Sequence, residues 1–89
     1  MAKTPDPELA KMLRELGSRI RARRAELEIS QERLAARAGV HWTYVGQVER
    51  GQRNPSTANL IKLAYGLQLD AGKLVSGLPV PTIDKDRPW

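Results

Sequence analysis

The segment from residue 31 to residue 50 constrains the fold of this 89-residue chain more than any other part of it. Apolar side chains recur there at three- and four-residue steps on both sides of Gly39, which predicts two short amphipathic helices. Gly39 suits the turn between them, because glycine adopts positive φ without a steric penalty. Ser30 is a good N-cap for the first helix, and Ala35 is small enough to let the two backbones cross closely. We therefore expect two short helices packed steeply across one another.

The amino-terminal part of the chain predicts one long helix. Asp6 followed by Pro7 is typical of a helix start, and apolar residues at three- and four-residue steps continue the pattern to about residue 26. Gly17 interrupts this helix, so we expect its first two turns to bend away or fray.

The carboxyl-terminal part predicts two further helices and no strand. Ser56 is the expected N-cap of a helix over 57–67, and Asp70 is the expected N-cap of one more turn. The expected inner face of the longer helix is Leu60, Ile61, Ala64 and Leu67. Five helices with short connections make an all-α domain. The expected organisation is a flexible segment over 1–6, one domain over 7–78 and a Pro-rich, flexible tail over 79–89.

Composition excludes several classes of function. The chain has no cysteine and a single histidine, so it has no disulfide framework, zinc ribbon or thiol nucleophile. No paired carboxylates, metal-ligand spacing or phosphate-cradling glycine loop is present, and we expect no enzyme, no metal and no cofactor. No apolar run reaches the roughly 18–20 residues of a membrane span. The net charge of +5 favours a nucleic-acid partner, because residues 33–62 hold five basic side chains against one acid.

The two short helices have the pattern of a helix-turn-helix unit, and the sequence around them extends a resemblance to one family. Residues 16–76 resemble the phage-repressor-like (Cro-type, XRE-type) DNA-binding domains, most of all the controller proteins of restriction–modification systems. The loop 51–56 and the helix sequence 58–64 are similar to the corresponding parts of that family. The resemblance implies a compact five-helix, lambda-repressor-like fold. It also implies an inward-facing ion pair between Arg24 and Glu49, against which stands the alternative of two unrelated surface charges.

Three positions depart from the family pattern. Glu28 and Gln68 stand where the family usually has glycine, at the exits from the first and fourth helices. A side chain in a left-handed cap costs about 1 kcal/mol, so we expect these exits to use another geometry. Trp42 stands where relatives commonly carry a polar or basic side chain, which counts against direct base hydrogen bonding at that position.

The unit implies a way of binding DNA, with the helix over about 42–50 lying in the major groove. The residues expected to read bases are Trp42, Thr43, Gly46 and Gln47. The residues expected to contact phosphates are Gln31, His41, Tyr44, Arg50, Arg53 and Asn54. Packing against the preceding helix is an equal alternative for Trp42, and a packing role is an equal alternative for Tyr44. His41 is also the expected cap of its helix.

A homodimer follows from the resemblance, since relatives of this length usually dimerise through the region after the fourth helix. The interface candidates are Leu67, Leu69, Leu74, Val75 and Leu78. For Leu67 and Leu74, closing the core of the monomer is an even alternative. A two-fold dimer predicts a palindromic operator with half-site centres about one helical turn apart.

The sequence therefore predicts a sequence-specific transcriptional regulator that binds double-stranded DNA as a homodimer. Its expected location is the cytoplasm, as a bacterial or phage-encoded protein associated with the nucleoid. The alternative is an antitoxin that regulates its own synthesis through the same unit and also binds a toxin. In that case residues 1–15 and 79–89 are the candidate toxin-binding segments.

Overall fold

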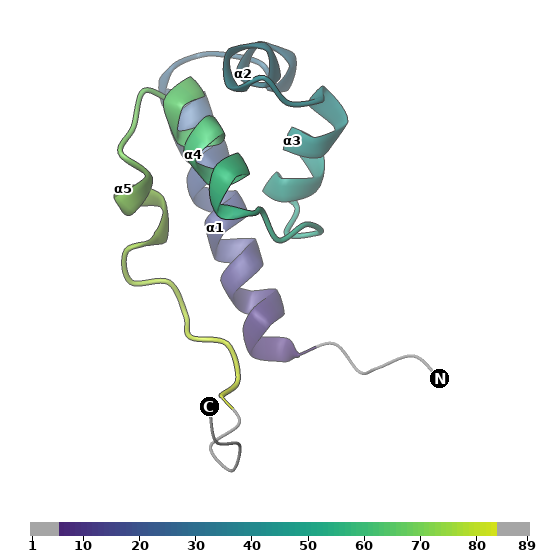
Figure 1. Cartoon of the computed structure of the whole chain (residues 1–89), viewed down its shortest axis with the longest axis vertical. Coiled ribbons are helices and arrows are strands. Elements are labelled where there is room, and N and C mark those ends of the chain that lie inside the picture. Colours follow the sequence, from purple (N-terminus) through teal and green to yellow (C-terminus); the bar gives the residue numbers. More distant parts are fainter. Residues whose placement is uncertain (1–5, 84–89) are drawn as a thin grey trace.

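The computed structural model describes residues 6–83, and in this part of the chain five helices are joined by short loops without any strand (Figure 1). The helices are α1 (Pro7–Glu26), α2 (Gln31–Ala38), α3 (Trp42–Glu49), α4 (Thr57–Gly66) and α5 (Ala71–Val75). The expected all-α fold class is confirmed. The predicted flexible segments lie largely outside the described residues, in 1–5 and 84–89.

The long helix α1 runs unbroken through Gly17, so the predicted bend or fraying is wrong. The helix begins as expected, with the Asp6 carboxylate accepting a hydrogen bond from the backbone N–H of Glu8 at 3.0 Å. Gly17 is buried, and a side chain there would collide with the backbone oxygens of Val48 and Glu49 at the end of α3. The glycine is therefore needed for the close approach of two helices.

The unit formed by α2 and α3 has the predicted turn. The Ser30 hydroxyl accepts from the backbone N–H of Arg33 at 3.0 Å and caps α2. Gly39 follows α2 with φ of 71°, in the left-handed region that glycine adopts without strain. His41 caps α3, and its Nδ1 accepts from the backbone N–H of Thr43 at 3.1 Å.

One apolar core is shared by all five helices. Its fully buried side chains are Ile20, Leu34, Val45, Val48, Leu63, Leu67 and Leu74. The helix α2 packs against both α3 and α4, and α1 packs against α3 and α5. Leu67 and Leu74 have 0% and 1% of their surface exposed, so they close the monomer core and offer nothing to a partner. Their expected place in a dimer interface is wrong, and the alternative holds.

The inner face of α4 differs from the predicted one at two positions, Ile61 and Leu63. Ile61 is predicted to face inward, yet 53% of its surface is exposed, whereas Leu63 is fully buried. Leu63 lies three residues after Leu60 and four before Leu67, so these residues share a helical face that excludes Ile61. Tyr65, four residues after Ile61, is 77% exposed and lies on the same outer face.

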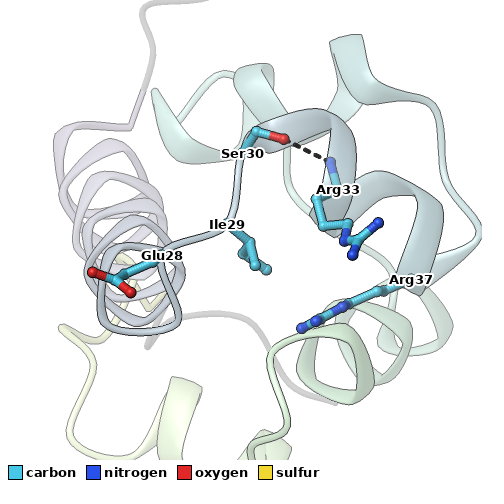
Figure 2. A pocket seen from close by; sticks show the side chains of 5 residues that line it. All are labelled: Glu28, Ile29, Ser30, Arg33 and Arg37. Atoms are coloured by element: carbon cyan, nitrogen blue, oxygen red, sulfur yellow. Dashed lines mark hydrogen bonds between the residues drawn. The ribbon is translucent and has the colours of Figure 1, made fainter.

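Both helix exits that lack glycine nevertheless adopt the left-handed conformation. Glu28 has φ of 55° after α1, and Gln68 has φ of 53° after α4. The expectation of another geometry is wrong. At the first exit the chain turns through Glu28 and Ile29 into the cap residue Ser30, beside a hollow over which Arg33 and Arg37 extend from α2 (Figure 2).

Two arginines of α1 bind the carbonyl groups at the ends of the later helices. Arg23 donates from Nε to the Leu67 oxygen at 3.0 Å and from Nη2 to the Gln68 oxygen at 3.2 Å. Arg19 donates from Nη1 to the Ser76 oxygen at 2.6 Å. The last carbonyls of a helix lack partners within it, so these arginines fix α4 and α5 against α1.

The chain after α5 returns along α1 toward its amino end (Figure 1). Thr82 donates its hydroxyl to Asp6 Oδ1 at 2.7 Å and its backbone N–H to Asp6 Oδ2 at 3.2 Å. The hydroxyl of Thr82 holds the pKa of the Asp6 carboxyl below its ordinary value, because it stabilises the ionised form. The cap of α1 is therefore also the attachment point of residues 79–83.

Candidate nucleic-acid interface

The start of α3 is exposed to solvent and carries two of the predicted reading residues. Trp42 has 52% of its surface exposed, and Thr43 is exposed beside it. The ring of Trp42 stacks on that of His41, with centroids 5.9 Å apart and an interplanar angle of 25°. Gln47 is half-buried one turn after Thr43, so the two side chains lie on one face of the helix.

His41 combines its cap with a contact to the hydroxyl of Thr43. Nδ1 accepts from the Thr43 backbone N–H, so it carries no proton, and it lies 2.7 Å from the Thr43 Oγ1. The Thr43 hydroxyl therefore donates to the ring, which leaves its oxygen lone pairs to accept from another group. The His41 ring is thereby fixed at the exposed amino end of the helix.

Gly46 is buried, unlike Trp42 and Thr43, and its expected role in reading bases stays a prediction. The residue is buried, and a side chain there would meet the Arg50 Nη1 at 3.1 Å and the Gln31 amide oxygen at 3.5 Å. These two side chains cover the middle of α3 from both sides, so the glycine accommodates their approach.

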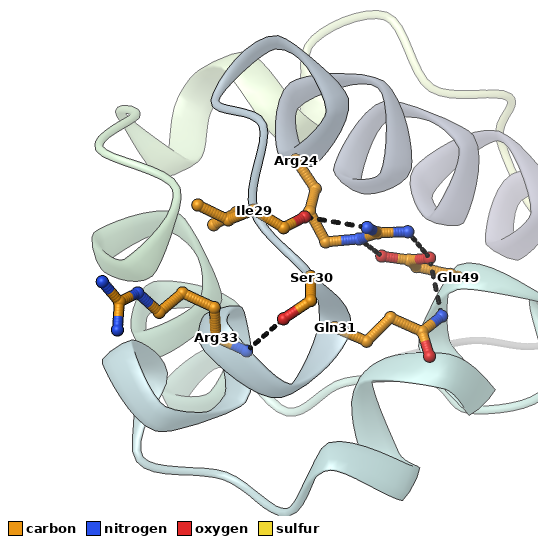
Figure 3. A network of polar contacts seen from close by, with 6 residues as sticks. All are labelled: Arg24, Ile29, Ser30, Gln31, Arg33 and Glu49. Atoms are coloured by element: carbon orange, nitrogen blue, oxygen red, sulfur yellow. Dashed lines mark hydrogen bonds and ion pairs between the residues drawn. The ribbon is translucent and has the colours of Figure 1, made fainter.

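A polar network joins the ends of three helices (Figure 3). Arg24 donates to both carboxylate oxygens of Glu49, from Nε at 2.7 Å and from Nη2 at 3.1 Å, and also to the Ile29 carbonyl at 2.9 Å. Gln31 donates from Nε2 to the Glu49 carboxylate at 3.0 Å. The carboxylate is 3% exposed, so all its partners come from the protein. The pair expected between Arg24 and Glu49 is thus present and ties α1, α2 and α3 together.

The Arg24 guanidinium stays charged in this network. Hydrogen bonding to Glu49 raises the pKa of the Arg24 guanidinium above its ordinary value. Gln31 has two amide hydrogens and gives one to the carboxylate. The Gln31 side chain is half-buried at the first position of α2, beside N–H groups of the helix end that have no partner within the helix.

A second polar cluster lies where α3 faces the start of α4. The phenolic oxygen of Tyr44 accepts from Asn59 Nδ2 at 3.2 Å. The guanidinium carbon of Arg53 lies 5.4 Å from the centre of the Tyr44 ring, within cation–π range. Tyr44 is half-buried and packs against the core, while Arg53 and Asn54 are exposed. The ring of Tyr44 thus packs on the core, while its hydroxyl takes part in a polar contact.

The remaining predicted phosphate contact is Arg50, which is exposed and donates from Nε to the Gln52 amide oxygen at 3.3 Å. Sequence reasoning missed Asn59. An asparagine in the first turn of a helix is so common a capping-region residue that its type gives no signal. Only the fold shows that it faces Tyr44.

Apart from Trp42 on α3, the exposed large apolar side chains lie on α4, α5 and the residues that follow α5. Val75 is 41% exposed, and Leu69 and Leu78 are half-buried. Ile61 and Tyr65, which are not among the interface residues expected from the sequence, are the largest exposed apolar groups of α4. They border a hollow of about 270 Å³ whose other lining residues are Ala64, Leu69, Asp70 and Ala71.

In the described part of the chain, no group of three or more histidine, aspartate or glutamate side chains is arranged to hold a metal ion. None of the described helices combines the length and the apolar character needed to cross a membrane.

Known proteins that are similar to this chain share its helix-turn-helix architecture. A family model described as Helix-turn-helix matches residues 20–74. Control protein C.SmaI of Serratia marcescens is 41% identical over 61 residues, which make up 68% of this chain and 73% of that protein. Repressor protein C2 of Salmonella phage P22 is 39% identical, but the chain spans only 29% of its length.

Two solved structures extend the comparison. The restriction-modification controller protein C.AhdI from Aeromonas hydrophila is 45% identical with a TM-score of 0.68, over 70% of this chain and 94% of that one. The phage P22 c2 repressor in complex with a synthetic operator is 39% identical with a TM-score of 0.65, over 70% of this chain and 94% of that one.

Proposed function

Because this chain belongs to the helix-turn-helix family, we propose that it regulates transcription by binding a palindromic DNA operator as a homodimer. The chain is a DNA-binding regulator with α3 as its recognition helix. The observation that carries the proposal is the geometry of α2 and α3: the amino end of α3 is exposed, and the start of α2 packs against the middle and the carboxyl end of α3 through Gln31.

The reading face consists of three residues. A major groove about 12 Å wide admits a helix, and the exposed start of α3 carries Trp42 and Thr43 into it. Gln47 follows one turn later and pairs with adenine through its amide. The Thr43 hydroxyl lies 2.7 Å from the His41 ring nitrogen, and its oxygen can accept a hydrogen bond from a base.

Contacts to phosphates flank this face on both sides. Gln31 lies on one side, held by Glu49, and Arg53 lies on the other, over the ring of Tyr44. Such contacts fix the position of the helix and carry no sequence information themselves. Asn54 and Arg50 are also exposed, and Arg50 adds positive charge to this part of the surface.

The dimer interface that we propose lies on the outer faces of α4 and α5. It consists of Ile61, Tyr65, Leu69, Val75 and Leu78, without the two buried leucines. Exposed apolar side chains grouped in this way are typical of an interface. A two-fold axis here places two copies of α3 on one side of the dimer, which requires an inverted repeat.

The relatives support a more specific role. C.SmaI is a control protein and C.AhdI is a restriction-modification controller, and we propose that this chain controls a restriction–modification system in the same way. Its site of action is then the DNA in the cytoplasm.

Selection of bound duplexes from a random DNA pool tests the proposal. We expect the selected sequences to share an inverted repeat with half-site centres about 34 Å apart. The purified protein shifts this duplex with a stoichiometry of two chains per repeat, and a duplex with one half-site binds much more weakly. Recovery of no common sequence at low salt would contradict the proposal.

A further inference from the structure

The hydrogen bond between Asn59 and Tyr44 has a direction, and the direction determines what the phenol can do. Asn59 Nδ2 is a donor only, so the bond at 3.2 Å occupies a lone pair of the Tyr44 oxygen. The single hydrogen of the phenol is then free. A hydroxyl that accepts one hydrogen bond is polarised and becomes a better donor in the next.

The surroundings of this hydroxyl favour an anion. Arg53 lies over the Tyr44 ring, and residues 50–69 contain no aspartate or glutamate. The Ser56 hydroxyl accepts from the Asn59 backbone N–H at 3.1 Å, which leaves the N–H groups of the two residues between them without partners in the helix. Every one of these groups donates or is positive, and the start of a helix attracts negative charge.

We propose that Asn59 is a positioning residue for DNA binding, which holds the Tyr44 hydroxyl as a donor to a backbone phosphate beside Arg53. This inference rests on the proposed function. It resolves the two roles open to Tyr44: its ring packs on the core, and its hydroxyl contacts phosphate because Asn59 supplies the other hydrogen bond.

The substitution Asn59→Asp tests the direction of the bond. It keeps the shape of the side chain but changes the donor into a carboxylate, which only accepts. The phenol hydrogen then turns to the new carboxylate and is no longer available to the phosphate. We expect affinity for the selected operator duplex to fall about tenfold or more, the usual effect of losing a hydrogen bond to a charged group.

The new carboxylate also repels phosphate, and the Tyr44→Phe background measures that effect alone. There the phenol is already absent, so we expect Asn59→Asp to weaken binding by a clearly smaller factor than in the original chain. Equal factors in the two backgrounds would overturn the proposal. Thermal unfolding of all four proteins shows that each is folded, and normal binding by the unmodified chain separates this result from a failure of the proposed function.

The salt dependence supplies a second readout that a structural role would not move. Tyr44→Phe removes a neutral donor, so we expect lower affinity with an unchanged logarithmic salt slope. Arg53→Ala removes a charge and reduces the slope by about 0.9 for each phosphate that the arginine neutralises. A Tyr44→Phe protein with unchanged affinity would also contradict the inference.

Discussion

The left-handed exits at Glu28 and Gln68 are places where a single substitution should stabilise the protein. Both residues have positive φ, 55° and 53°, although each carries a side chain. The left-handed conformation costs a residue other than glycine roughly 1–2 kcal/mol. Glycine avoids this cost but loses about 0.5–1 kcal/mol more conformational entropy on folding. The balance is a gain of about 0.5–1 kcal/mol in the free energy of unfolding for each of Glu28→Gly and Gln68→Gly.

Denaturant and thermal unfolding measure this gain directly. For a domain of this size, 1 kcal/mol corresponds to roughly 4–8 °C in Tm, so we expect a rise of a few degrees at fixed protein concentration. The protein concentration must be held constant, because the dimer that we propose would link Tm to it. The slope of free energy against denaturant should not change, since the surface buried on folding is the same.

Two control variants separate backbone strain from side-chain effects. Glu28→Ala removes the carboxylate but keeps the strained backbone, and we expect its stability to stay within about 0.5 kcal/mol of the original. Gly39→Ala introduces the strain where φ is 71° and no atom lies within 4 Å of the added carbon, so it should cost about 1 kcal/mol. A Glu28→Gly protein no more stable than Glu28→Ala would refute the reasoning.

Individual contacts lead to four further predictions. Gly17→Ala should lower the free energy of unfolding by about 3 kcal/mol, because the added carbon meets immovable backbone oxygens; a helix-propensity effect alone would raise it. His41→Ala should cost about 1 kcal/mol through loss of the cap, whereas His41→Asn should retain most of it; equal stability of the two variants in urea would contradict the capping role. Gln47→Ala should reduce discrimination at one base pair by about 1–3 kcal/mol, and an unchanged preference in a fresh selection would show that the assumed docking is wrong. Thr82→Val should return the pKa of the Asp6 carboxyl toward 3.8, which NMR titration measures. Because the pKa in the folded chain is lower than 3.8, the contact stabilises the fold above pH 3.8, and this stabilisation disappears as the pH falls through the lowered pKa.

The sequence predicted the helices well because their signals are local. Caps such as Ser30 and Ser56, and a glycine such as Gly39, act within a few residues of their own position, and the structure uses each one as expected. Apolar spacing also placed most of the core. Ile61 was misplaced because an apolar residue next to a buried stripe satisfies the same pattern whether it faces the core or a partner.

What the sequence could not predict are contacts between residues distant in the chain. From the sequence alone, Gly17 is expected to interrupt the helix. Only the fold shows that the end of α3 lies against it. Arg19 and Arg23 look like a solvated face, yet they bind carbonyls more than forty residues away. Asn59 gained its place beside Tyr44 in the same way, from the packing of α4 on the rest of the domain.

The network around Glu49 connects stability to DNA binding. A buried ion pair contributes little net stability, because desolvation offsets most of its attraction, but losing one partner costs roughly 3–5 kcal/mol. Its effect here is to fix positions: Arg24 at the end of α1 holds the last residue of α3, and the same carboxylate holds Gln31 at the start of α2. The Glu49 side chain is 3% exposed and that of Arg24 is 18% exposed, so solvent has little access to these bonds. One group therefore sets the positions of α3 and of Gln31, the phosphate contact that we propose, before DNA is bound, and this lowers the ordering cost of binding.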